Sequence, residues 1–204
     1  MKIRLGSLAA MFTLTAGLSH LQAQEMHWGL YGGFTTNNNP SSQTPVGFLP
    51  PSPVNPSTNL GAANTFLGGV QAEWKFGPGT DFGRWWGAGL DLAGIAPTGG
   101  KVFQNTIGTI SPNGYFHVAK WPEKWRMPDP TRMDVYATGG YTALFQQFGA
   151  NGFNAGAGVN IWSETNGMMI EVRYVREVGS NAPVTGSPYF EVRVGWIHRT
   201  GSPR

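Results

Sequence analysis

The chain has 204 residues, of which only 12% are charged, while 13% are aromatic and 30 are glycine. The formal net charge is +3 at pH 7, and two of the cations, Lys2 and Arg4, lie in an N-terminal segment that we expect to be removed. The remaining chain is nearly neutral and therefore has no basic field that would favour nucleic acid. Cysteine is absent, so an exported form must be held together by packing or backbone pairing without disulfides.

The N-terminal segment has the pattern of a secretory signal peptide. Two cations precede an apolar run from Leu5 to Leu18, and a small residue, Ala23, follows. The run is about 14 residues long, whereas a membrane-spanning helix needs roughly 20. We therefore expect residues 1–23 to be the signal peptide and residues 24–204 to form one domain. The alternative interpretation is a buried N-terminal helix.

Alternation of apolar and polar residues predicts strands along the rest of the chain. Most of the alternating segments are about 9–14 residues long; a tilted membrane strand needs about 9–11, whereas soluble strands average about five or six. The segments are Met26–Thr36, Thr65–Phe76, Arg84–Ile95, Asn113–Trp121, Met133–Gln146, Phe153–Trp162, Met168–Glu177 and Pro188–Arg199. A soluble antiparallel sandwich also alternates, so it is the strand length that favours a membrane barrel.

The connections between these segments predict the topology. With a periplasmic N-terminus, the external connections are residues 37–64, 96–112, 148–152 and 178–187, and the periplasmic ones are 77–83, 122–132 and 163–167. Long outer loops and short inner turns are typical of membrane barrels, although here the third loop is short and the second turn is long. Asn166-Gly167 is the dipeptide preferred in a tight hairpin turn.

The aromatic residues lie near the ends of the predicted strands, where the two membrane interfaces attract them. We predict an aromatic girdle of Trp28, Trp74, Trp86, Trp121 and Trp196 at the periplasmic end, and of Phe34, Phe66, Phe145 and Phe190 at the other. By the parity of their positions, Trp85 and Trp162 point inward. Lipid offers no water to an open sheet edge, so the strands must close. The sequence therefore predicts an all-β fold, an eight-stranded antiparallel up-and-down transmembrane β-barrel.

The second half of the chain carries the strongest local pattern, in Tyr136–Tyr141, Asn154–Asn160 and Val192–Trp196. In pattern and topology the chain resembles the small eight-stranded outer-membrane barrels, the class of the OmpA transmembrane domain and OmpX. The resemblance implies the outer membrane of a Gram-negative bacterium, with its lipid and the barrel-assembly machinery as partners. That class usually ends on an aromatic residue, whereas here Trp196 is followed by further residues up to Arg204. We expect a monomer and an unidentified external ligand.

Charged residues at inward positions predict an ion-pair network inside the barrel, because buried charges must be paired. Antiparallel pairing of the last two strands sets Glu171 near Arg193 and Arg173 near Glu191. The full predicted network is Glu171, Arg173, Glu191, Arg193, Glu73, Lys75 and Asp91. We interpret the network as structural, filling a narrow lumen. The alternative interpretation is that it forms the gate of a small pore.

No phosphate loop, zinc-binding spacing or nucleophile elbow is present in the sequence. Ser180-Asn181 after Arg176-Glu177 faintly resembles a neighbourhood of the lipid A deacylases, but the nearby histidine is missing. We therefore predict no catalytic residue, cofactor or metal, and a structural or surface-interaction role with a side-chain-filled lumen. The alternatives are a narrow pore, a lipid-modifying barrel enzyme and a soluble secreted β-sandwich.

Overall fold

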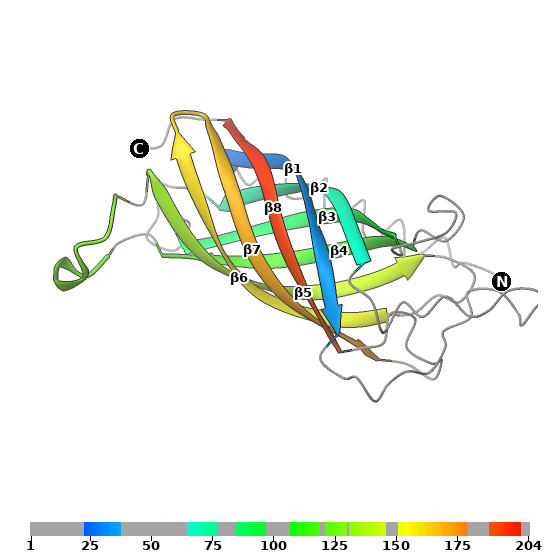
Figure 1. Cartoon of the computed structure of the whole chain (residues 1–204). Helices are drawn as coiled ribbons and strands as arrows, with labels where there is room; N and C mark the ends of the chain where they lie inside the picture. Colours follow the sequence, from blue (N-terminus) through cyan, green and yellow to red (C-terminus); the bar gives the residue numbers. More distant parts are fainter. Residues whose placement is uncertain are drawn as a thin grey trace, which may run out of the picture.

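The strands form a single closed sheet. The computed structural model describes residues 23–37, 65–76, 85–96, 107–118, 121–129, 131–145, 151–178 and 188–200. Within these residues, eight strands pair antiparallel in chain order, and the last pairs with the first to close the barrel (Figure 1). This confirms the predicted all-β barrel and excludes the soluble sandwich. The predicted signal peptide lies outside the described residues except for Ala23, the first residue of the first strand.

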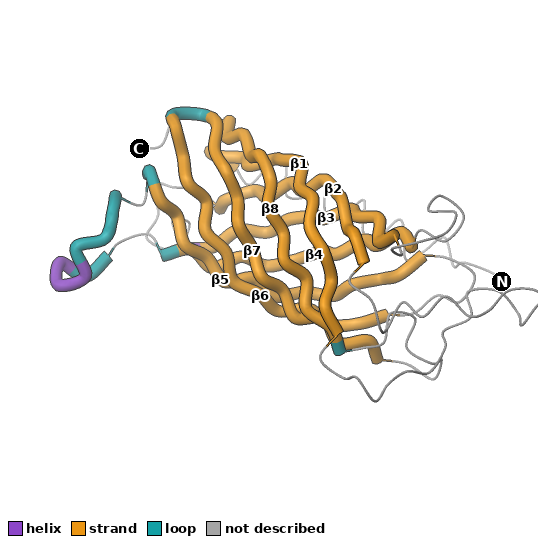
Figure 2. The backbone as a smooth tube through the Cα atoms, in the orientation of Figure 1, coloured by secondary structure: helices purple, strands orange, loops and turns teal. Residues whose placement is uncertain are grey.

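The strands are long and run at a slant around the barrel (Figure 2). They are β1 (Ala23–Asn37), β2 (Thr65–Phe76), β3 (Trp86–Ala96), β4 (Ile107–His117), β5 (Met133–Phe145), β6 (Asn151–Ser163), β7 (Asn166–Val178) and β8 (Tyr189–Thr200). The connections β2–β3, β4–β5 and β6–β7 lie at one end, which we call the turn end; the opposite end is the loop end. Among the described residues, no helix is long and apolar enough to cross a membrane.

The fourth strand differs most from its prediction. We expected a strand at Asn113–Trp121, but β4 begins at Ile107 and ends at His117. Pro112 lies inside it, in register with Leu90 of β3, and the ladder between β4 and β5 is interrupted at this point. Proline has no amide hydrogen to donate, so it fits a strand only where one ladder bond is absent. Trp121 therefore lies beyond the strand that it was expected to close.

The β6–β7 turn also differs from its prediction. Its two central residues are Glu164 and Thr165, and Asn166-Gly167 already belongs to β7. Glu164 has φ 57°, which is the positive φ that a type II′ turn requires at its first central position. Gly167 pairs with Trp162, and a Cβ at Gly167 would lie 2.6 Å from the carbonyl oxygen of Ile161 and 2.9 Å from the indole ring of Trp162. The glycine is therefore explained by the close approach of this carbonyl and this ring and not by the turn.

The distribution of side chains is the reverse of that in a soluble protein. Charged side chains are buried inside the barrel: Glu171 is 0% exposed, Arg173 1% and Arg193 2%. The exposed large apolar side chains on the outside include Trp28, Leu30, Phe34, Phe66, Val70, Trp74, Trp86, Leu92, Phe116, Phe153, Ile170, Val172, Val194 and Trp196. A contiguous apolar outer surface of this kind requires an apolar surrounding.

Candidate functional site in the barrel lumen

Five charged side chains meet in the middle of the lumen and form what we call the central ion cluster. Its members are Asp91 from β3, Glu171 and Arg173 from β7, and Glu191 and Arg193 from β8. All five are buried. Each lies at an inward position because side chains along a strand alternate between the two faces of the sheet.

The carboxylate of Asp91 binds both guanidinium groups of the central ion cluster. Nη1 of Arg173 donates to Oδ2 of Asp91 at 3.0 Å, and Nη1 of Arg193 donates to the same oxygen. Each arginine also binds the glutamate two residues before it: Nε of Arg173 lies 2.8 Å from Oε1 of Glu171, and Nε of Arg193 lies 2.8 Å from Oε2 of Glu191. Three carboxylates thus surround two guanidinium groups, which compensates their burial.

The strand register is the one that antiparallel pairing predicted, but the ion pairs are partly different. Glu171 is in register with Arg193, and Arg173 with Glu191. The first pair approaches to 3.7 Å. Among the described contacts, no ion pair joins Arg173 to Glu191. Arg173 instead reaches Asp91, because the long guanidinium side chain extends to the opposite wall of the narrow barrel.

Two tyrosines complete the central ion cluster, and sequence reasoning did not assign them to it. The hydroxyl of Tyr31 donates to Asp91, and the hydroxyl of Tyr136 donates to Oε2 of Glu171 at 2.9 Å. The guanidinium of Arg193 also lies 4.6 Å from the centre of the Tyr31 ring, which is a cation–π distance. Both tyrosines occupy inward positions. The sequence feature that could have identified them is a tyrosine on the polar face of a predicted strand.

Glu73 and Lys75 do not join the central ion cluster. They lie nearer the turn end, in a second group that we call the histidine cluster. Its members are Glu25 and His27 from β1, Glu73 and Lys75 from β2, His117 from β4 and Asp134 from β5. The predicted network is therefore divided into two clusters. Of Glu73, Lys75 and Asp91, only Asp91 contacts the arginines.

His117 lies between two carboxylates of the histidine cluster. Its Nε2 is 2.5 Å from Oε1 of Glu73, and its Nδ1 is 2.8 Å from Oδ2 of Asp134. A histidine donates from both ring nitrogens only as the imidazolium cation. The geometry therefore fits a protonated His117 that donates a hydrogen bond to each acid. Lys75 adds a second contact to Asp134 at 3.3 Å.

His27 binds the remaining acid and packs against a tryptophan. Its Nε2 lies 2.7 Å from Oε1 of Glu25, and its ring centre lies 4.8 Å from that of Trp162. The guanidinium of Arg199 lies 4.7 Å from the centre of the same indole. Trp162 therefore points inward, as its parity predicted, and helps to fill the lumen near the turn end.

The histidine cluster brings acids and bases together inside the barrel. His117 is 1% exposed and Glu73 is 5% exposed, so both side chains are buried. Among the described hydrogen bonds, no serine hydroxyl contacts the ring of His27 or that of His117. Within the described ranges, no group of three or more histidine, aspartate or glutamate side chains is placed to hold a metal ion. The arrangement can neutralise buried charge and close the lumen.

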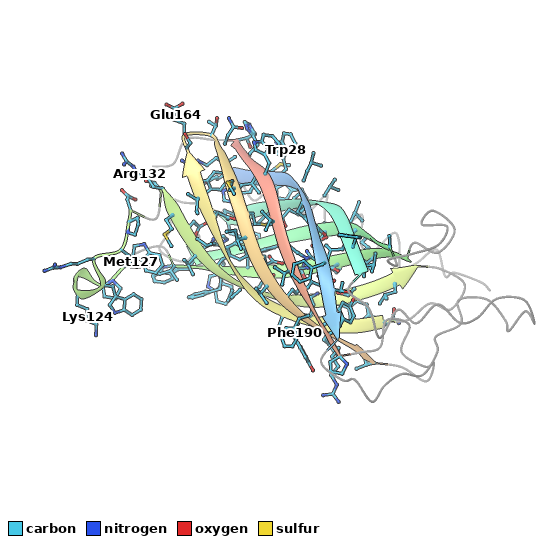
Figure 3. The ribbon with its side chains drawn as sticks, in the orientation of Figure 1. Trp28, Lys124, Met127, Arg132, Glu164 and Phe190 are labelled. Atoms are coloured by element: carbon cyan, nitrogen blue, oxygen red, sulfur yellow. The ribbon has the colours of Figure 1, made fainter. Side chains whose placement is uncertain are left out.

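Most residues of the predicted aromatic girdle face outward. Trp28, Trp74, Trp86, Trp196, Phe34 and Phe66 are exposed on the outer surface. Phe190 is half-buried against Tyr174, while Trp121 lies in the β4–β5 connection against Trp125. Trp28 and Phe190 lie near opposite ends of the barrel (Figure 3). The side chain of Phe145 lies outside the described residues.

Further outward aromatic residues were not in the predicted girdle, and one prediction of side-chain direction differs. Phe116, Tyr141 and Phe153 are also exposed on the outer surface. Trp85 was expected to point inward, but it precedes β3 and its ring stacks on Phe116, an outward residue, at 5.5 Å. Parity fails there because the residue lies before the first paired residue of the strand.

Comparison with known proteins supports the fold. No protein-family model matches the sequence, and no curated protein sequence gives a significant match. The N-terminal β-barrel domain of OprF from Pseudomonas aeruginosa has a similar structure, with a TM-score of 0.52 at 9% identity over 87% of this chain and 98% of that domain. Such low identity shows the fold alone. The predicted resemblance to small outer-membrane barrels is confirmed at that level.

Two further solved structures are similar over most of the chain but have lower TM-scores. A designed transmembrane β-barrel gives 0.45 at 12% identity, over 86% of this chain and 94% of the designed one. The attachment invasion locus protein Ail of Yersinia pestis gives 0.38 at 9% identity, over 86% of this chain and 97% of Ail.

Proposed function

We propose that this chain is a monomeric barrel of a Gram-negative outer membrane, which stabilises the envelope or presents its loop end to an external ligand. The observation that carries the proposal is the reversed distribution of side chains, apolar outside and charged inside. Lipid accommodates an outer surface with this many exposed aromatic and aliphatic side chains. Outer-membrane lipid and the barrel-assembly machinery are the partners that this location implies.

The lumen supports a structural role and not a pore. The central ion cluster and the histidine cluster hold buried ion pairs across the interior, and the ring of Trp162 contacts both His27 and Arg199. Eight-stranded barrels have an interior just wide enough for side chains to fill. In planar bilayers, we expect the purified protein to give no stable channel openings. Regular openings in wild-type protein would instead support the narrow pore.

The proposed role is non-enzymatic. The two inward histidines, His27 and His117, are engaged by carboxylates, and both are buried. A general base must reach the proton of a bound substrate, and neither side chain is accessible for this. Incubation of the purified protein with lipid A should leave the mass of the lipid unchanged. Loss of an acyl-chain mass would contradict the proposal and favour the lipid-modifying enzyme.

A further inference from the structure

The β4–β5 connection is long for the turn end and has an internal structure of its own. The β6–β7 connection has two turn residues, whereas the β4–β5 connection runs from residue 118 to 132 and contains the 3-10 turn Glu123–Trp125. The amide of Trp125 donates to the carbonyl of Pro122 at 2.9 Å, and the amide of Arg132 donates to the carbonyl of Asp129 at 2.8 Å. These bonds order two described parts of the connection, residues 121–129 and 131–132.

Asp129 holds the second half of this connection. The backbone amide of Thr131 donates to Oδ1 of Asp129 at 2.8 Å, and this hydrogen bond lowers the pKa of the carboxyl group. Arg126 has φ 46°, a conformation that residues other than glycine adopt at an energetic cost. A residue in such a costly conformation in an exposed turn suggests that the shape of the turn has a functional role.

The surface of the connection combines apolar and cationic side chains. Trp125 is 53% exposed and Met127 is 39% exposed. The exposed cations Lys124, Arg126 and Arg132 lie in the same connection, which also carries the exposed carboxylate of Asp129. We call Trp125, Met127 and these three cations the Trp–cation surface. The ring of Trp125 contacts that of Trp121 at 6.1 Å, which ties the exposed indole to the base of the connection.

The Trp–cation surface lies beside the barrel and not over its opening. In Figure 1 the green 3-10 segment stands away from the rim to one side, and Figure 3 shows Lys124 and Met127 clear of the barrel at the same end as Glu164. The outer surface of this end already carries exposed aromatic residues: Trp28, Trp74, Trp86, Phe116 and Trp196. Of these, Trp86 on β3 and Phe116 on β4 lie on the side of the barrel from which the connection leaves, whereas Trp28 and Trp196 lie on the opposite wall.

These features match the chemistry of a membrane surface. Indole rings prefer the level of the lipid headgroups, and each lysine or arginine near an anionic bilayer strengthens binding by about fivefold. We propose that the Trp–cation surface binds anionic phospholipid headgroups in the leaflet at the turn end, with Trp125 and Met127 inserted and the three cations on the phosphates. This inference rests on the proposed membrane location of the barrel.

The test uses a single spin label on the full chain. Because the protein has no cysteine, Met127→Cys provides a unique labelling site, and Thr165→Cys in the β6–β7 turn provides a matched control. The labelled proteins are reconstituted in phosphatidylcholine vesicles with and without phosphatidylglycerol. We expect the label at position 127 to become accessible to oxygen and protected from a water-soluble nickel chelate when phosphatidylglycerol is present. The label at position 165 should stay accessible to the chelate.

A charge variant separates insertion from simple crowding of the label. Lys124→Gln with Arg126→Gln in the Met127→Cys background should abolish the dependence on phosphatidylglycerol. If position 127 is as accessible to the chelate as position 165 in anionic vesicles, the inference is wrong. Protection that arises only when purified peptidoglycan fragments are added would also overturn it and assign a glycan partner.

Heat-dependent gel mobility of each labelled protein distinguishes the two possible failures. A folded, inserted barrel with an accessible label at position 127 contradicts only the lipid-binding surface. A chain that does not insert contradicts the proposed function, and the inference with it.

Discussion

The guanidinium of Arg193 on β8 donates a hydrogen bond to the carboxylate of Asp91 on β3, 102 residues away in the sequence. The two strands are not neighbours in the sheet, since β1 and β2 lie between them. The contact therefore crosses the interior and joins walls that no backbone ladder connects directly. Arg193 also binds Glu191, so one cation pairs with acids from both walls.

Removal of this cation should destabilise the barrel strongly. Arg193→Met leaves Asp91 and Glu191 buried with fewer positive partners, and breaking a buried pair on one side costs about 3–5 kcal/mol. Urea unfolding in lipid vesicles measures the change. Asp91→Asn in the same background should recover part of the loss, because it lowers the excess negative charge that remains in the central ion cluster. Arg176→Met, at an exposed position, is the control and should change stability by less than about 0.5 kcal/mol.

Substitution by alanine should change the stability of the barrel differently at two adjacent glycines, Gly32 and Gly33. A Cβ at Gly33 would lie 1.9 Å from the carbonyl oxygen of Val192, whereas at Gly32 the nearest atom is 3.9 Å away. Gly33→Ala forces the neighbouring strand to move and should cost about 1–3 kcal/mol or more. Gly32→Ala should be neutral or stabilise by up to about 1 kcal/mol. Equal urea midpoints for the two variants would show that the two positions do not differ in packing.

An arginine on the outer surface tests whether that surface contacts lipid. Val194 lies in the middle of β8 and is 47% exposed, whereas Val178 ends β7 and is 41% exposed. Val194→Arg should cost about 2–4 kcal/mol, and Val178→Arg about 0–1 kcal/mol, because the cost of a charge falls from the midplane to the interface. Vesicle-folding titrations measure both. In a barrel surrounded by water, the two substitutions would be equally tolerated.

Near Pro112, where the ladder between β4 and β5 is interrupted, the side-chain hydrogen bonds of Thr142 should stabilise the barrel. The hydroxyls of Ser111 and Thr142 lie 2.9 Å apart, and the side-chain amide of Asn154 donates to Thr142 at 2.9 Å. Thr142→Val leaves these buried groups without their partner and should cost about 1–3 kcal/mol. Thr165→Val, in the exposed β6–β7 turn, is the control. No difference between the two in urea unfolding would mean that water replaces the lost contact.

The fold could be predicted because the strands alternate over unusual lengths. The bounds of β2 match the prediction, and β5 differs by one residue at its end. The largest difference is β4, where the strand contains Pro112 and begins before it. A single sequence does not show that one ladder bond is absent at this proline, because that depends on how the neighbouring strand pairs.

The lumen was predicted less completely than the fold. Strand parity placed Glu171, Arg173 and Asp91 inside, and register brought Glu171 opposite Arg193. Parity gives no information on contacts across the barrel. It therefore missed that Glu73 binds His117 instead of an arginine, since β2 and β4 are not adjacent and their side chains meet across β3 on the inner face of the sheet.

The most direct test of the membrane-barrel assignment is the gel mobility of the outer-membrane fraction with and without boiling. A closed barrel has no free edge from which to unfold in detergent, so the unheated protein should migrate as a compact species that shifts on heating. The protein should also be found only with the outer membrane. Identical mobility before and after boiling, together with recovery in the soluble periplasmic fraction, would contradict the assignment.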